Sequence, residues 1–483
     1  MTAPRRRVRT DAHELREGFA AIRTEYEVPV EFPPDAAAEA EQAAADGGRV
    51  AGTGRRTDLT DLPFVTIDPP GSRDLDQAMH LSRDGAGYRV RYAIADVAAF
   101  VTPGGALDLA VRDRALTVYC PDRRVGLHPE VLSEGAASLL PGQTRPAVVW
   151  DVRLDADGEV LSADVGRAVV RSRAQLDYPT QQRALDEGRA DPMIELLTEV
   201  GAARARIERA RGGVSLGKPE QEVVDAPGGG WDLEFRAPRP VEDHNAQISL
   251  LTGMTAAAMM LEAGVGVLRT MPAAPPEAVR RLRLRGLALG VPWPKGMSYG
   301  DVLASLDRSL PATAAFLDAA VSLFRGAAWE PFVGTPPDDV VHGAVAAPYA
   351  QVTAPLRRLV DRYGTEVCLA AQEGQEPPEW VLAGLEDLGR VMAEGNRRAS
   401  AVDRACTDLV EAAVLAPHIG EEFDGVALDG RTVQLTHPAV VARTVEDDLP
   451  AGRAVRVRLV RADPQERQVV LTSDLGPEPP EAP

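Results

Sequence analysis

The stretch Thr66-Ile-Asp-Pro-Pro-Gly-Ser-Arg-Asp-Leu-Asp-Gln-Ala-Met-His-Leu81 places three carboxylates, Asp68, Asp74 and Asp76, within nine residues. The Pro-Pro-Gly sequence between the first acid and the other two predicts a turn, so the chain doubles back and brings the acids together. If the segment after the turn is extended, Asp74 and Asp76 leave one face while Leu75 points to the core.

This acidic stretch is a candidate metal site. Carboxylate oxygens without a cysteine or a close histidine favour Mg²⁺ or Mn²⁺ over zinc. The alternative is a solvated turn, because aspartate is a common turn residue, and the spacing alone does not decide between the two. Evidence from the rest of the chain is needed to decide between a metal site and a solvated turn.

Length and composition limit the class of protein. A chain of 483 residues predicts two to four domains, and an apolar fraction of 45% is that of a folded globular protein. No apolar run reaches the length of a membrane span and the N-terminus lacks a signal-peptide stretch, so we expect a cytoplasmic protein without a membrane partner. Three widely spaced cysteines without a CxxC pair argue against a disulfide framework and a structural zinc site.

The net charge of −19 argues against a general nucleic-acid coat, because nonspecific affinity for phosphates comes from basic surface. It leaves room for an enzyme with a local basic channel. Arginines occur in clusters, among them Arg357-Arg358. Most such clusters are solvated helix faces, but one or two lining a cleft would be enough to hold a phosphate.

The patterns along the chain change twice. Alternating apolar residues predict an antiparallel β region with strands at 64–67, 88–97 and 148–154, and residues 106–115 carry helical spacing. From Met193 onward helices dominate, at 194–211, 241–263, 277–289, 312–324, 357–371 and 380–415. Five short apolar runs between 422 and 472 then predict a small barrel of the OB type. A further helix is expected over 11–24.

Three blocks in one order resemble the catalytic RNB domain of the ribonuclease II and ribonuclease R family. They are the acidic stretch Ile67 to Ala78, the blocks between Tyr92 and Pro141, and Tyr349-Ala-Gln-Val-Thr-Ala-Pro-Leu-Arg-Arg358 with Asp361. The resemblance spans about residues 61–372 and is far more specific than any one block.

The resemblance implies an α+β fold, with a mixed β-sheet core and helices that roof an RNA channel. The expected domains are an accessory, partly helical segment at 1–57, an RNB catalytic domain at 58–418 and the OB-like barrel at 419–475. A segment of 57 residues does not accommodate the family's two N-terminal cold-shock domains, so a short form without them is expected.

Members of this family hydrolyse single-stranded RNA from its 3′ end to nucleoside 5′-monophosphates, with Mg²⁺ or Mn²⁺. By resemblance, Asp68, Asp74 and Asp76 match three of four active-site aspartates, and Asp74 and Asp76 are expected to be catalytic as well as metal-binding. Gln77 stands at the fourth position. Its amide oxygen could bind a metal or orient a water but brings no negative charge, so one metal should bind more weakly.

Further site residues follow from the same resemblance. Arg357 matches the arginine expected to hold the scissile phosphate, and Arg358 could do the same, since the sequence does not separate them. Without the family, a helix-terminal arginine paired with a surface acid would be the simpler interpretation. Tyr119 matches an aromatic that stacks on a base near the 3′ end, and Tyr349 and Thr353 are expected to shape the phosphate pocket.

Two other functions stay open. Gln77 could mark lost chemistry, which would leave a catalytically weakened or inactive RNA-binding or regulatory protein on the same fold. A metal-dependent phosphoesterase for small molecules is the third class, and it predicts no dependence on RNA length. The retained acids and Arg357 favour the exoribonuclease, acting on single-stranded RNA as a monomer.

Overall fold

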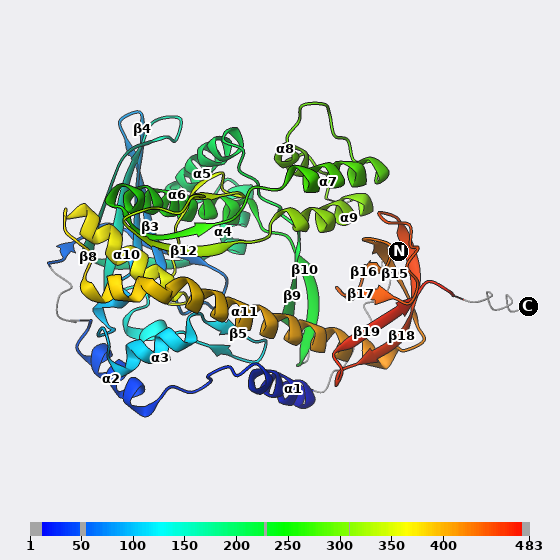
Figure 1. Cartoon of the computed structure of the whole chain (residues 1–483). Coiled ribbons are helices and arrows are strands. Elements are labelled where there is room, and N and C mark those ends of the chain that lie inside the picture. The colour runs from blue at the N-terminus through cyan, green and yellow to red at the C-terminus, as the bar shows by residue number, and fades with distance from the viewer. Residues whose placement is uncertain (1–11, 49–54, 227–228, 309, 476–483) are drawn as a thin grey trace, which may run out of the picture.

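The computed structural model describes residues 12–48, 55–226, 229–308 and 310–475. A large α+β body and a small barrel lie at opposite ends of the molecule, and the long helix α11 (Glu379–Leu415) runs from one to the other (Figure 1). The predicted α+β architecture is confirmed.

The N-terminal segment adds two helices to this body. The predicted first helix is confirmed as α1 (Ala12–Glu25), and its apolar side packs against α11 with Phe19 edge-on to Trp231. A second helix, α2 (Pro34–Ala45), lies against α3 (Ala106–Arg114), which was also predicted. Glu39 of α2 accepts the backbone N–H groups of Ala106 and Leu107 and so caps α3. Residues 1–11 and 49–54 of the expected accessory segment lie outside the described residues.

The main sheet carries the acidic stretch. Its order is β1-β8-β2-β3-β4-β7, and β8 also pairs with β7. The strands are β1 (Thr57–Asp58), β2 (Phe64–Asp68), β3 (Gln77–Asp84), β4 (Gly87–Ala95), β7 (Thr144–Leu154) and β8 (Val160–Asp177). The three strands predicted from alternation correspond to β2, β4 and β7, so those predictions are confirmed.

The strand β8 was missed in the sequence. It pairs with β7 up to Arg171 and with β2 from Ser172 to Asp177, so one long strand joins the two ends of the sheet. Its first residues, including Val160 and Leu161, are exposed, and this weakens the alternation that marks a half-buried strand. The pairing sets the end of β2, at Asp68, beside the end of β8.

Helices cover this sheet. The predicted helices α5 (Pro192–Ala210) and α6 (Pro240–Ala263) pack on each other, and α6 also contacts α10 (Leu359–Gln372). The helix α6 ends at Gly264, whose φ of 69° is a left-handed conformation that glycine adopts without strain. A short helix α4 (Tyr178–Asp186) follows β8 directly.

The start of α10 differs from the prediction. The helix begins at Leu359, after Arg358 in an extended conformation and Arg357 in a turn. Arg358 forms an isolated β-bridge with Leu116, and Thr117 donates its N–H to the carbonyl of Arg357 at 3.0 Å. We call residues 350–358 the arginine loop.

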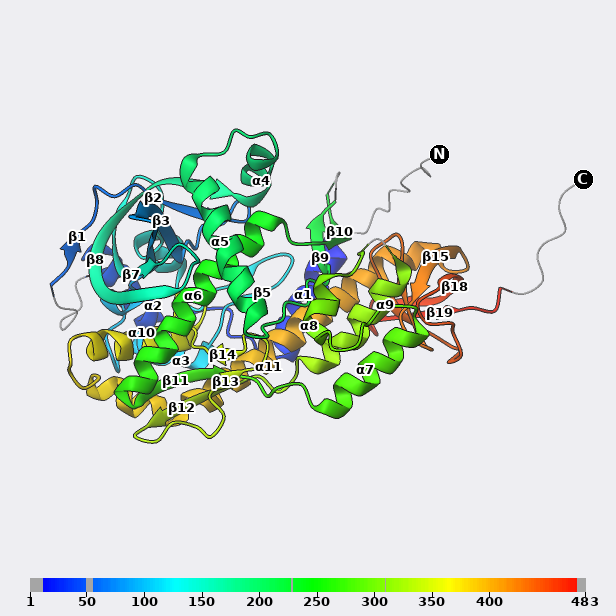
Figure 2. The ribbon, with the colours of Figure 1, turned by 90° about the horizontal axis from the view of Figure 1, so that it is seen from above.

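The region in which helices were predicted to dominate also contains paired strands. They are β9 (Glu220–Asp225) with β10 (Trp231–Arg236), β11 (Val265–Thr270) with β12 (Ala328–Val333), and β13 (Val341–His342) with β14 (Ala347–Pro348); β5 (Val118–Tyr119) pairs with β6 (Arg124–Val125) farther upstream. Helices α7 (Pro276–Ala288), α8 (Tyr299–Ala304) and α9 (Pro311–Ala320) surround a core of their own near the barrel (Figure 2). Single turns of 3₁₀ or π helix occupy Val97–Ala99, Leu132–Ala136, Val321–Leu323 and Ala416–His418.

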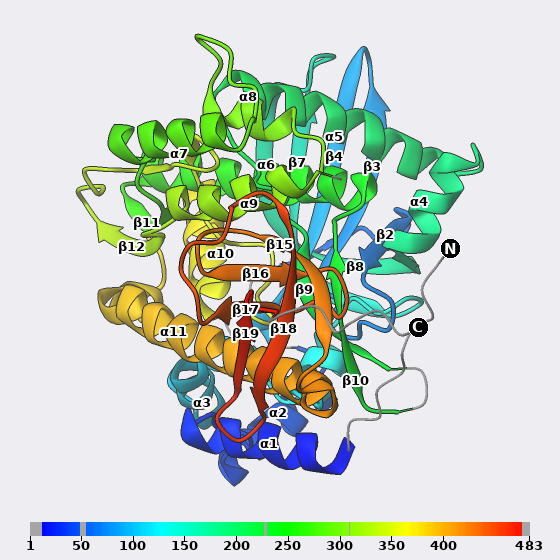
Figure 3. The same ribbon diagram turned by 90° about the vertical axis from the view of Figure 1, so that its right-hand side faces the viewer.

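The predicted C-terminal barrel is confirmed. Five strands close in the order β15-β16-β17-β19-β18 (Figure 3). They are β15 (Glu422–Ala427), β16 (Thr432–Leu435), β17 (Val441–Thr444), β18 (Ala454–Asp463) and β19 (Gln468–Thr472), and their inward apolar side chains join one core with α1 and the end of α11. Among the described residues, no helix has the length and apolar character needed to cross a membrane.

Candidate active site

The acidic stretch folds as a turn between two neighbouring strands. β2 ends at Asp68, the turn passes through Gly71 with φ 83°, and β3 begins at Gln77. Leu75 is fully buried and donates its N–H to Ser138 Oγ at 3.0 Å, as a core position requires. The segment from Ser72 to Asp76 belongs to no strand.

The arginine loop meets the acidic stretch at Asp76, across 280 positions of sequence. The buried carboxylate of Asp76 accepts the backbone N–H of Leu356 at 2.7 Å through Oδ1. Its Oδ2 lies 3.6 Å from Nε of Arg357. The two motifs that the sequence separates therefore form one site.

Two of the acids are strained electrostatically. Burial, with a contribution from Asp74, raises the pKa of Asp68 to about 7. Burial also raises the pKa of Asp76 to about 8, although Arg357 and the N–H of Leu356 oppose the shift. Burial removes most of the water that would stabilise the ionised carboxylates, and the positive groups nearby do not fully replace it. The protonated form of each acid is therefore favoured.

The donor set suits a hard divalent cation. Oδ2 of Asp68 is buried and has no hydrogen-bond partner among the described residues, so one carboxylate oxygen is free to bind a cation. The three acids offer only oxygen, which Mg²⁺ and Mn²⁺ prefer. Within the described part of the chain, no three His, Cys, Asp or Glu side chains are already grouped as a closed metal site, so the acids would have to draw together around an ion.

Asp74 has a protein partner that the sequence did not reveal. Nη1 of Arg124 lies 2.5 Å from Oδ1 of Asp74, and the same guanidinium pairs with Glu134. Arg124 is at the start of β6, five residues after Tyr119 and directly after Arg123. In the sequence, the position of Arg123 and Arg124 close to Tyr119 could have suggested a role near the site, but it did not indicate a contact with Asp74.

The structure separates the two candidate arginines. The guanidinium of Arg358 forms a two-nitrogen pair with the fully buried Asp361, with Nη2–Oδ1 at 2.7 Å and Nε–Oδ2 at 2.9 Å. The side chain of Arg358 is 17% exposed, whereas that of Arg357 is 44% exposed. Arg357 therefore has nitrogens available to a ligand, while Arg358 fixes the loop to α10.

Gln77, predicted as a weak metal ligand, is bonded to protein through both ends of its amide. Nε2 donates to the carbonyl oxygen of Thr353 at 2.6 Å, and Oε1 accepts the hydroxyl of Tyr92 at 2.6 Å. Thr353 is buried; its carbonyl accepts the bond from Gln77, and its hydroxyl lies 3.5 Å from Nη2 of Arg358. Tyr92 is the first residue of the second block that resembles the family, and its bond to Gln77 could not be inferred from spacing.

The two predicted aromatics lie in different environments. Tyr119 on β5 is 49% exposed, and its pKa is raised to about 12 by local desolvation and by Asp74, which places it near the acids. Tyr349 is half-buried behind the arginine loop, with its ring edge-on to His342 at 5.9 Å. Only Tyr119 presents a ring to solvent beside the acids.

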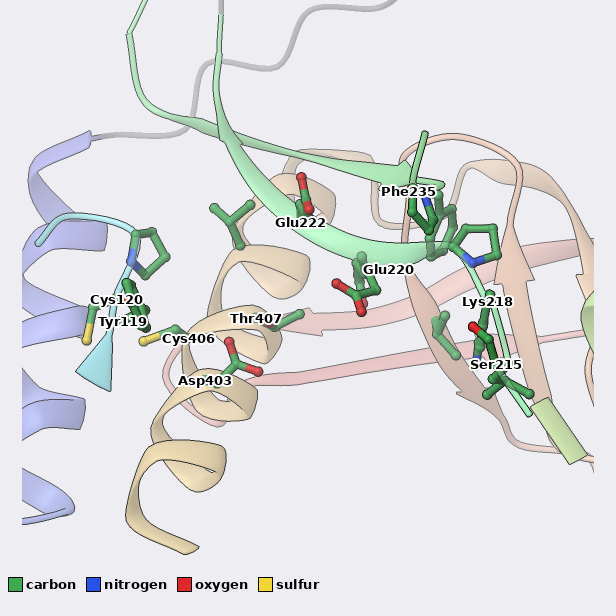
Figure 4. A pocket seen from close by; sticks show the side chains of 18 residues that line it. Tyr119, Cys120, Ser215, Lys218, Glu220, Glu222, Phe235, Asp403, Cys406 and Thr407 are labelled. Carbon is green, nitrogen blue, oxygen red and sulfur yellow. The ribbon is translucent and has the colours of Figure 1, made fainter. Parts of the chain in front are cut away.

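A cavity of about 1140 Å³ extends from Tyr119 toward the barrel. Figure 4 shows Tyr119 and Cys120 on one side, Asp403, Cys406 and Thr407 of α11 below, and the strand β9 across from them. The charged lining residues are Glu220, Glu222, Asp403 and Lys218. Three acids against one lysine repel phosphates, so this cavity offers little to a nucleic-acid backbone.

Comparison with known proteins adds an independent line of evidence. The model of the RNB domain matches residues 56–367, and that of the RNase II-type exonuclease C-terminal S1 domain matches residues 421–473. Ribonuclease R of Vibrio parahaemolyticus is 27% identical over 451 residues, which cover 84% of this chain and 51% of that protein. The chain thus spans about half the length of the curated relatives it matches.

Two further similarities bear on the site and the fold. A protein of Arabidopsis thaliana named inactive exonuclease DIS3L2 is 41% identical over 140 residues, covering 28% of this chain and 13% of that protein. The structure of Mycoplasma genitalium RNase R in complex with ribose-methylated single-stranded RNA aligns with a TM-score of 0.84 at 18% identity, covering 96% of this chain and 78% of that one. At that identity, the similarity establishes a shared fold. Since the RNB model covers more than half of the chain, the protein belongs to the RNB-domain family and carries an RNase II-type S1 domain at its C-terminal side.

Proposed function

We propose that the protein is a hydrolytic 3′-to-5′ exoribonuclease that degrades single-stranded RNA to nucleoside 5′-monophosphates with Mg²⁺ or Mn²⁺. The observation that carries the proposal is the meeting of the acidic stretch with the arginine loop, where Arg357 lies 3.6 Å from Asp76. Relatives named ribonuclease R and exoribonuclease 2 support the reaction class. The cytoplasmic location and the monomeric state stay predictions.

The residues divide the chemistry between them. Asp68, Asp74 and Asp76 would hold the divalent cation, which when bound supplies positive charge to the phosphate oxygens and the departing 3′ oxygen. Arg357 would donate to the scissile phosphate as negative charge develops there. Arg358 keeps the loop in place through its ion pair with Asp361. The guanidinium of Arg357 is therefore positioned before the substrate binds.

Tyr119 would support the 3′ end of the RNA. Its exposed ring beside the acids can stack on a base, and stacking contributes about 1–3 kcal/mol per base regardless of sequence. The helices α5 and α6 pack on each other, and α5 contacts β3 of the sheet; a roof of this kind would suit an unpaired strand. These features suit an enzyme that removes nucleotides from any single strand.

A second function is favoured by one specific observation. Both ends of the Gln77 amide are already bonded to protein and the amide has no negative charge, so this position would be a weaker ligand than the fourth acid of the family. An inactive exonuclease among the relatives shows that the family name alone does not guarantee activity. The alternative is therefore an RNA-binding protein on the same fold with weak or absent catalysis.

Incubation of a 5′-labelled oligoribonucleotide with protein and Mg²⁺ separates the two functions. The exoribonuclease predicts a ladder that shortens from the 3′ end, and the Asp76→Asn variant should leave the RNA intact. RNA that is bound but never shortened by the wild-type protein would establish the alternative. A dinucleotide and a long strand cleaved at the same rate would instead indicate a small-molecule phosphoesterase.

A further inference from the structure

Gln77 belongs to a directed chain of hydrogen bonds. Tyr92 is buried, donates its hydroxyl to Oε1 of Gln77 at 2.6 Å and lies 2.9 Å from Oγ of Ser249. A phenol has one hydrogen, so Ser249 must donate to Tyr92. Gln77 then passes its own N–H to the carbonyl oxygen of Thr353 at 2.6 Å. The chain runs from α6 through β4 and β3 into the arginine loop.

One neighbour of Gln77 accepts a hydrogen bond and the other donates one, and an amide side chain satisfies both. The carbonyl oxygen of Thr353 can only accept, so the group that faces it must be a donor, and a carboxylate has none when ionised. A glutamate, the carboxylate of the same length, would set oxygen against oxygen at this position unless a cation or proton lay between them. The N–H of Gln77 supplies that positive end permanently, without a bound ion.

The bond from Gln77 to Thr353 lies next to two other positions at which the arginine loop is anchored. The N–H of Ala354 is held by Asp361 at 2.6 Å and that of Leu356 by Asp76 at 2.7 Å. Gln77 fixes the residue just before them, at Thr353. Three side chains, of which Gln77 is uncharged, therefore hold the loop in addition to its backbone contacts with Leu116 and Thr117.

We propose that Gln77 is a positioning residue that clamps the arginine loop to β3 and keeps Arg357 beside Asp76, in place of the metal-binding role of a fourth acid. The inference rests on the proposed function. It predicts that the amide of Gln77 contributes to the geometry of the loop and nothing to the affinity for divalent cations.

Two variants test the clamp in the full-length protein. Gln77→Met keeps the length of the side chain and removes both of its bonds. Tyr92→Phe removes the bonds of the hydroxyl to Oε1 of Gln77 and to Ser249, and leaves the bond from Gln77 to Thr353 in place. Gln221→Met is the matched control, because its amide likewise donates to a backbone carbonyl, that of Ala439 at 2.6 Å, far from the acids. The readouts are Mn²⁺ affinity by calorimetry without RNA, hydrogen exchange of the arginine loop, and kcat and KM on an oligoribonucleotide.

For Gln77→Met we expect Mn²⁺ affinity and stoichiometry within twofold of wild type. The Ala354 and Leu356 amides should exchange about tenfold faster, which corresponds to one lost hydrogen bond. A loop displaced by about 1 Å should lower kcat about a hundredfold and leave KM nearly unchanged. Tyr92→Phe should shift exchange and kcat in the same direction by less, and Gln221→Met should change none of them.

Loss of one Mn²⁺ equivalent, or a tenfold weaker affinity, with unchanged exchange of the loop would show that Gln77 is a ligand and overturn the proposal. Unchanged exchange and kcat in both Gln77→Met and Tyr92→Phe would overturn it as well. Should the wild-type protein cleave no RNA, the proposed nuclease function fails separately, and the calorimetry and exchange data still decide the role of Gln77.

Discussion

Raising the pH in the absence of divalent cations should destabilise this protein through its buried acids. The pKa of Asp68 is raised to about 7 and that of Asp76 to about 8, mainly by burial, whereas aspartate in an unfolded chain ionises near pH ~3.9. Between these limits the native state binds more protons than the unfolded state. Stability is therefore highest near the acid end of the window and is lost as the pH rises from about 4 to about 8.

The size of the effect follows from proton linkage. Each acid that is protonated in the native state and ionised in the unfolded state changes the free energy of unfolding by about 1.4 kcal/mol per pH unit. From pH 5 to pH 7 the two acids together account for about 5 kcal/mol at most. A cation that binds the ionised acids reverses the loss, and at a hundredfold excess over its Kd it contributes about 2.7 kcal/mol.

Urea denaturation at fixed pH values, in EDTA or in Mn²⁺, measures both effects. The Asp76→Asn variant removes one titrating group and should flatten the pH dependence by about 1.4 kcal/mol per unit. Glu411→Gln is the matched control, because burial raises the pKa of Glu411 to about 7 beside Gln221, away from the site. That variant should also flatten the pH dependence but keep the full stabilisation by Mn²⁺. Equal stabilisation of the wild-type protein by Mn²⁺ at pH 5 and pH 8 would show that binding of the cation does not depend on the ionised form of these acids.

Four further predictions concern the residues around the acids and the sugar of the substrate. Arg358→Met should lower the free energy of unfolding by about 3–5 kcal/mol, because it leaves Asp361 buried and unpaired. Arg357→Met should change stability by about 0.5 kcal/mol or less yet lower kcat about 10²–10³-fold; equal stability losses in the two variants would contradict the assignment. Tyr119→Ala should weaken RNA binding by about 1–3 kcal/mol in a filter-binding titration, and Tyr119→Phe should not. Matched RNA and DNA oligomers should be cleaved at clearly different rates, since only RNA has the 2′-OH, and equal rates would argue against contacts to the ribose.

Local patterns predicted much of this fold. The Pro-Pro-Gly turn, the buried Leu75 and the strands ending at Asp68 and starting near Tyr88 all follow from side-chain alternation and turn chemistry. The C-terminal barrel was predicted from its five short apolar runs and closes as expected. These features depend on residues close in sequence.

Other features depend on partners that are distant in sequence. The start of α10 lies beyond Arg358 because Leu116 pairs with that residue, a contact that no local pattern encodes. The bonds from Gln77 to Thr353 and from Arg124 to Asp74 likewise join segments brought together only by the folded chain. Spacing indicated the acids and the resemblance to the family indicated both arginines, but only the tertiary contacts distinguish Arg357 from Arg358.

The most direct test of the central claim is a crystal structure with Mn²⁺ and a short RNA bearing a nonhydrolysable linkage at its 3′ end. We expect an anomalous peak bound by Asp68, Asp74 and Asp76, with the guanidinium of Arg357 within hydrogen-bond distance of the phosphate beside it. A peak away from these acids, or Arg357 turned from the phosphate, would contradict this expectation.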